Sequence, residues 1–125
     1  MAVLSGCTSL SGYKEASLRH YAYASGEKDA TAAEWHALVS EFQQVIATDT
    51  EGPFADDAQY AMASSWVWSI TTGDTEAPQQ AIEALQKLVH TYPNSPYVPH
   101  AHYWLGRCYD YTNCLLYTSP SPRDS

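Results

Sequence analysis

Apolar residues recur at helical spacing in two stretches of the chain. In the first stretch they fall at relative positions i, i+1, i+4, i+7 and i+8: Leu38, Val39, Phe42, Val45 and Ile46. The second stretch repeats this spacing: Ala81, Ile82, Leu85, Leu88 and Val89. Residues at these intervals share one face of a helix with about 3.6 residues per turn, so both stretches are predicted to be amphipathic helices that bury this face.

The two stretches belong to a longer internal repeat. Sliding the sequence against itself by 43 positions superposes identical residues without a gap: Gln43 on Gln86, Thr48 on Thr91, Pro53 on Pro96, Ala58 on Ala101 and Tyr60 on Tyr103. A period between about 20 and 50 residues is typical of stacked helical hairpins, because one hairpin alone cannot bury its apolar face. The fold is therefore predicted to be all-α, built from tandem helical hairpins.

Signals at the helix ends divide the repeat into single helices. Thr31 followed by Glu34 forms the pattern of a capping box, and Pro78 suits the first turn of a helix. Gly26 and Gly73 are predicted to end the helices that precede them. Together these signals predict five helices, at about residues 13–25, 31–48, 54–72, 78–92 and 97–111.

The repeat resembles the tetratricopeptide repeat. Three residues match the Leu, Gly and Tyr positions of the first helix of that repeat: Leu105, Gly106 and Tyr109. Three others match the small, large and proline positions of its second helix: Ala81, Leu85 and Pro93. The stretch 92–106 is similar to tetratricopeptide envelope proteins of Gram-negative bacteria, of the kinds found in the Tol-Pal system and the outer-membrane β-barrel assembly machinery. The resemblance covers residues 13–113, although its units are longer than the usual ~34 residues. It implies an α-solenoid that binds a partner protein and is not an enzyme.

The N-terminal residues resemble the lipobox of bacterial lipoproteins. Leu4, Ser5, Gly6 and Cys7 match the motif, in which the cysteine thiol receives a lipid. The resemblance implies that residues 1–6 are the remnant of a truncated signal peptide and that residues 7–12 form a lipid-anchored tether. It implies a location at the periplasmic face of the bacterial outer membrane, with the lipid on Cys7 as the protein's membrane contact. A chance match to the motif would leave an unanchored cytoplasmic or secreted protein.

Residues 114–125 differ in character from the rest of the chain. They resemble a translated sequencing-library adapter, and Pro120 and Pro122 within them oppose helix formation. We therefore expect a non-native tail after a C-terminally truncated repeat domain at residues 13–113. The helix at 97–111 would then lack its own second helix, leaving Tyr103 and Leu105 without cover.

Charge narrows the possible partners. The chain has 14 acidic and 6 basic side chains, a formal net charge of −8, which opposes binding to nucleic acid or to an anionic lipid surface.

With Cys7 lipidated and Cys114 in the tail, Cys108 is the one cysteine left in the repeat domain. It is expected to be a small buried apolar residue.

The sequence carries no recognisable catalytic or cofactor-binding motif. His100 and His102 are two positions apart on a predicted helix and so point in different directions, which argues against a shared metal ion. Asp56 and Asp57 fall in the first turn of a predicted helix, where negative charge favours the helix dipole. We expect no cofactor, no metal ion and no small-molecule substrate.

The resemblance also implies a binding groove lined by first helices. Its partner-facing positions would hold a protein or peptide segment: Tyr60, Ser64, Trp68, Tyr103 and Arg107. The alternative is that these side chains only pack between repeats. The leading functional prediction is a lipid-anchored periplasmic scaffold in envelope assembly or maintenance. The alternative, from a different functional class, is that the chain is the helical N-terminal part of a larger cell-wall enzyme of the peptidoglycan lyase type, whose catalytic domain is missing.

Overall fold

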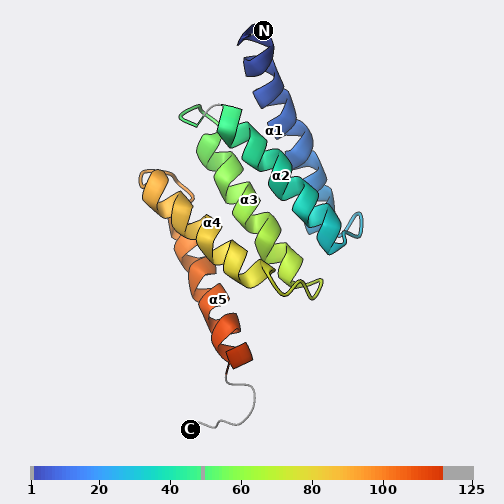
Figure 1. Cartoon of the computed structure of the whole chain (residues 1–125), viewed down its shortest axis with the longest axis vertical. Helices are drawn as coiled ribbons and strands as arrows, with labels where there is room; N and C mark the ends of the chain where they lie inside the picture. Colours follow the sequence, from blue (N-terminus) through green and yellow to red (C-terminus); the bar gives the residue numbers. More distant parts are fainter. Residues whose placement is uncertain (1, 49, 117–125) are drawn as a thin grey trace.

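The described part of the chain is all-helical. The computed structural model describes residues 2–48 and 50–116, and the side chains of residues 12–48 and 50–112. This part contains five helices and no strand: α1 (Ala2–Ala24), α2 (Ala32–Thr48), α3 (Ala55–Ile70), α4 (Ala77–Thr91) and α5 (Val98–Leu116) (Figure 1). The prediction of five helices is confirmed.

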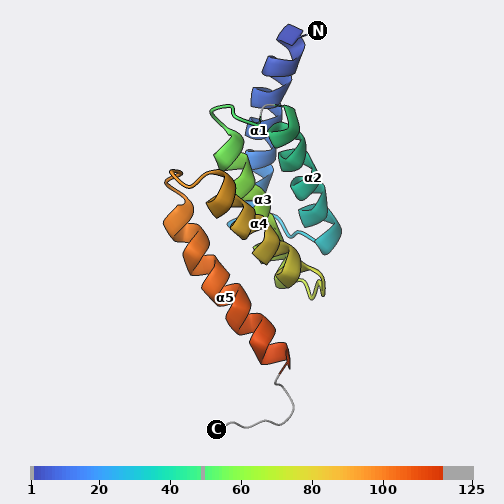
Figure 2. The same cartoon turned by 60° about the vertical axis from the view of Figure 1, so that its left-hand side comes forward.

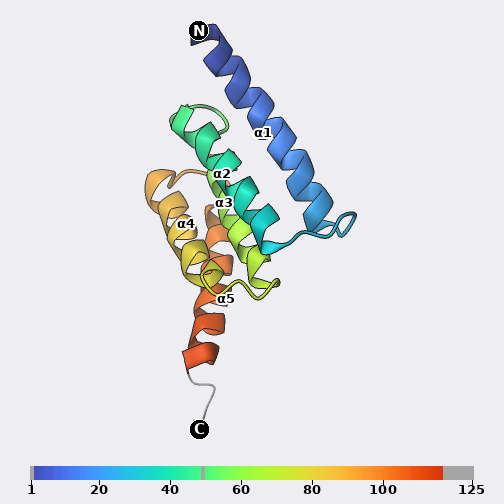
Figure 3. The same cartoon turned by 45° about the vertical axis from the view of Figure 1, so that its right-hand side comes forward.

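Successive helices run in opposite directions and pack side by side. Each helix contacts the next one in the sequence, and α1 also contacts α3 (Figures 1 and 2). The first turns of α1 extend beyond α2 at one end of the molecule, and the last turns of α5 extend beyond α4 at the other (Figures 2 and 3). The helices therefore pack mainly against their neighbours in the sequence.

The core consists of the two predicted apolar stripes and the small residues between them. Leu38, Phe42 and Leu88 are fully buried, and Leu85 is 1% exposed. Val89 is half-buried at the edge of this core. Burial of each large apolar side chain stabilises the fold by roughly 1.5–3 kcal/mol.

The predicted helix-end signals have the expected geometry. The Thr31 amide donates to a Glu34 carboxylate oxygen at 2.8 Å, and the Glu34 amide donates to the Thr31 hydroxyl at 3.3 Å, which completes the capping box. Gly26 and Gly73 have φ angles of 87° and 85°, in the left-handed region that glycine adopts without strain. Pro78 lies in the first turn of α4. Local sequence thus explains where the chain turns.

The two outer helices are longer than predicted. α1 begins at Ala2 and so includes the backbone of residues 7–12, which were expected to form a tether. Serine and glycine lower helix propensity by up to about 1 kcal/mol per residue, but residues 2–24 contain no proline, which would break the backbone ladder. α5 likewise continues to Leu116, into the expected tail, whereas Pro120 and Pro122 lie outside the described residues.

The length and apolar character of the helices bear on membrane insertion. In the described part of the chain, none combines enough length with enough apolar character to cross a bilayer.

Candidate functional site

A cavity of about 220 Å³ opens between α1 and α3. Each of these helices presents side chains at intervals of three and four residues, so that two helical faces oppose each other across the cavity. Phe42 of α2 contributes to the lining from between them, and Tyr97 contributes from the turn before α5. The remaining lining residues are Tyr13, Ser17 and His20 of α1 and Asp57, Tyr60, Ala61 and Ser64 of α3.

Two polar pairs bridge segments across the cavity. The His20 Nε2 atom lies 3.1 Å from the Ser64 hydroxyl oxygen, and the Tyr97 hydroxyl donates to Asp57 Oδ1 at 2.6 Å. Burial lowers the pKa of His20, so the ring stays neutral at neutral pH and one nitrogen remains a hydrogen-bond acceptor. The hydrogen bond to Asp57, together with burial, raises the pKa of Tyr97 far above its ordinary value. The cavity therefore offers donors and acceptors without requiring a buried cation.

Aromatic side chains pack against one another along the cavity. The rings of Tyr60 and Tyr97 stack with centroids 4.7 Å apart and planes 11° apart. Tyr13 stacks on Phe54 at 5.2 Å and meets the edge of Phe42 at 6.2 Å. Such contacts contribute about 0.5–1.5 kcal/mol each beyond their area burial. These contacts fix the aromatic side chains of the lining against one another.

The predicted groove residues fall into three places. Tyr60 and Ser64 line this cavity. Trp68 lies farther along α3, in a second cavity of about 300 Å³, where its ring stacks on Trp35 at 6.2 Å. Tyr103 and Arg107 line neither cavity. They lie exposed on α5, where Arg107 donates to the Tyr103 hydroxyl at 3.0 Å.

Sequence reasoning missed the contribution of α1. Tyr13, Ser17 and His20 have no counterpart in the 43-residue alignment, because α1 lies outside the two superposed stretches. Their spacing of i, i+4 and i+7 is the available signal that they share one helical face. It could have identified them once α1 was placed beside α3.

Other predicted residues keep simple roles. Asp56 and Asp57 lie in the first turn of α3, as expected, although Asp57 also holds Tyr97. Cys108 is buried as predicted, and burial raises the pKa of its thiol. Tyr103 is 55% exposed, whereas Leu105 is half-buried against the core. The side chain of Cys7 lies outside the described residues, so its lipidation stays a prediction.

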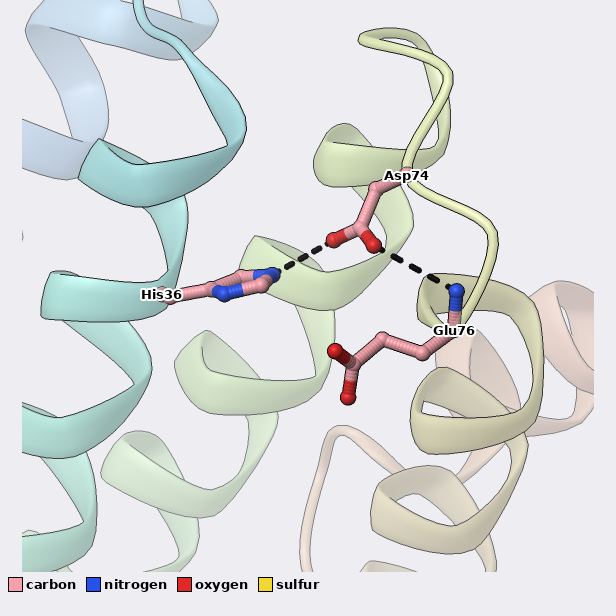
Figure 4. A group of neighbouring side chains, drawn as sticks. All are labelled: His36, Asp74 and Glu76. Atoms are coloured by element: carbon pink, nitrogen blue, oxygen red, sulfur yellow. Dashed lines mark hydrogen bonds and ion pairs between the residues drawn. The ribbon is translucent and has the colours of Figure 1, made fainter.

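A second polar group joins α2 to the turn between α3 and α4. The His36 Nε2 atom donates to Asp74 Oδ2 at 2.5 Å, and the Glu76 amide donates to Asp74 Oδ1 at 3.3 Å (Figure 4). The Ser69 hydroxyl also donates to Asp74 Oδ2, at 2.7 Å. Burial alone would raise the pKa of Asp74, but these hydrogen bonds hold the pKa below its ordinary value. Sequence analysis did not predict this cluster, because its members come from three separate segments.

Comparisons with known proteins add no identification. No protein-family model, no curated protein and no solved structure matches this chain. Functional inference therefore rests on the residues and their geometry.

Proposed function

We propose that the chain is a tetratricopeptide-type helical scaffold that holds an extended peptide segment of a partner protein between α1 and α3. The single observation that carries the proposal is the cavity, which two alternate helices form together. α1 and α3 also contact each other directly, and in helical-repeat arrays the small rotation between successive repeats creates a concave binding surface. No catalytic step is part of the proposal.

The chemistry of the lining suits a peptide. Aromatic and apolar walls can bury one side chain of a bound segment, and the polar pair of His20 and Ser64 can exchange hydrogen bonds with its main chain. Tyr60 is the expected anchor, because half-buried tyrosine combines a large contact area with little conformational entropy to lose.

Charge indicates what kind of segment fits. Asp57 lines the cavity, Asp56 precedes Asp57 in the sequence, and the whole chain carries a formal net charge of −8. Complementary potentials raise association rates and reject partners of like charge. The favoured occupant is therefore a segment with a basic residue beside an apolar one.

Binding of displayed peptides tests whether the cavity between α1 and α3 holds a peptide. Peptides selected from a random library against the full chain should be enriched in Lys or Arg next to an apolar residue. Tyr60→Ala should weaken their binding by about tenfold, since loss of a central aromatic contact costs about 1.4 kcal/mol or more. Fluorescence anisotropy with labelled peptide measures the change.

Tyr21→Ala is the matched control for this test. Tyr21 is a tyrosine of α1 that is 66% exposed and does not line the cavity, so its removal should leave affinity unchanged. Equal affinity for Tyr60→Ala and the unaltered chain would refute the groove. Tyr103→Ala measures separately whether the bound segment extends to α5.

We further propose that Cys7 carries a lipid that anchors the scaffold at the periplasmic face of the bacterial outer membrane. The support is the lipobox-like run that ends at Cys7. Labelled palmitate should be incorporated when the chain is expressed behind a complete lipoprotein signal sequence in a Gram-negative host, and Cys7→Ser should abolish the label. Equal labelling of both proteins, or of neither, contradicts the anchor.

A further inference from the structure

Three side chains converge outside the cavity between α1 and α3: those of His36, Asp74 and Glu76. Figure 4 shows the His36 ring extending from α2, the Asp74 carboxylate from the turn after α3, and the Glu76 carboxylate turned back toward the same region. A ring nitrogen of His36 and one carboxylate oxygen each of Asp74 and Glu76 lie within 4.8 Å of one another. The proposed peptide site uses none of these residues.

Side-chain rotation would bring the three groups to the spacing that a small metal ion requires. Zinc binds nitrogen and oxygen ligands at about 2.0–2.2 Å, so ligand atoms around one tetrahedral zinc lie about 3.4 Å apart. The His36 Nε2 and Asp74 Oδ2 atoms, at 2.5 Å, are closer than this and must move apart to hold one ion between them. Glu76 is exposed, so its side chain can rotate inward without disturbing the core. The partial exposure of His36 also leaves access for water as a fourth ligand.

The least mobile ligand is oriented by neighbouring groups. The Asp74 side chain is 8% exposed, and it is held by the Ser69 hydroxyl on one oxygen and by the Glu76 amide on the other. Hydrogen bonds of this kind fix the direction of metal-binding carboxylates in known sites. Asp74 is thus oriented independently of His36, and loss of the His36 hydrogen bond on metal binding leaves it in place.

We propose that His36, Asp74 and Glu76 form a binding site for a divalent transition-metal ion, with zinc as the best fit. A neutral imidazole and two carboxylates carry two negative charges, which one such ion neutralises. Imidazole favours zinc and its neighbours, whereas magnesium and calcium prefer six or more oxygen ligands. The ion connects α2 to the start of α4, across α3, and so stabilises the packing of these three helices.

Zinc titration of the full chain tests the site. Isothermal titration calorimetry with Zn²⁺ should show one ion bound per chain with a dissociation constant below about 100 µM. Glu76→Gln removes one ligand charge from an exposed position and should weaken binding by tenfold or more. His36→Gln removes the imidazole but keeps a side-chain donor for Asp74, and it should weaken binding similarly. Mg²⁺ should give no heat at the same concentrations.

Glu83→Gln provides the matched control, because it removes the same charge from an exposed position two turns along α4. This variant should bind Zn²⁺ as the unaltered chain does. Circular dichroism of each variant confirms that the helices are retained. Absence of zinc binding to the unaltered chain overturns the proposal, and so does zinc binding that neither Glu76→Gln nor His36→Gln weakens.

Discussion

Phe42→Ala is expected to lower the free energy of unfolding by about 3–5 kcal/mol. Phe42 is fully buried on α2, and its ring meets the edges of Tyr13 and His20 from α1. Truncation removes the apolar contact and leaves a space that these two rings cannot fill without leaving their positions beside α3. Because small domains have a total stability of about 5–15 kcal/mol, the loss is a large share of it.

Urea unfolding followed by circular dichroism measures this loss. Phe54→Ala is the matched control, since Phe54 is half-buried, stacks on Tyr13 and leaves a space open to solvent. It should cost about 1–2 kcal/mol, in proportion to the smaller area buried. If Phe42→Ala destabilises the protein no more than Phe54→Ala does, the greater contribution expected from the fully buried Phe42 ring is wrong.

The helices and their buried faces follow from local sequence. Residues such as Leu38 and Leu85 recur at helical intervals, and this interval alone tells which face of each helix is apolar. The capping box at Thr31 and the glycines at the turns are equally local, since each depends on neighbours within a few residues. For this reason the order of the helices and the approximate bounds of α2, α3 and α4 could be predicted without knowledge of their packing.

The candidate sites depend on pairs that local sequence does not specify. His20 meets Ser64, His36 meets Asp74 and Tyr97 meets Asp57, in each case across at least 38 positions of the sequence. Periodicity places a residue on a face, but it does not fix how far one helix slides or rotates against another. The side chains that lie opposite one another can therefore be known only from the folded arrangement.

The predicted row of groove residues shows the same limit. Tyr60 and Trp68 share a face of α3, but eight residues at about 1.5 Å each separate them by roughly 12 Å along the helix axis. They consequently line two different cavities. Tyr103 follows Tyr60 by one repeat, yet it lies exposed because α5 packs mainly against α4. Equivalent positions in a repeat thus have different surroundings at different places in the array.

Substitution of the repeated alanines should make this difference measurable. Ala58 and Ala101 occupy the same repeat position, and both are fully buried. Ala58→Leu is expected to lower the free energy of unfolding by about 3 kcal/mol, because α3 is held between α2 and α4 and cannot move aside for the added carbons. Ala101→Leu is expected to cost about 1 kcal/mol, since α5 can shift away from α4.

Urea unfolding of the two variants gives both values, and Ala37→Leu controls for the change of residue type. Ala37 is exposed on α2, and leucine has nearly the helix propensity of alanine, so this variant should differ from the unaltered chain by less than about 0.5 kcal/mol. Equal losses for Ala58→Leu and Ala101→Leu would mean that α5 is held as firmly as α3. The order of the two losses therefore tests whether the stability of each helix in the array depends on how many neighbouring helices pack against it.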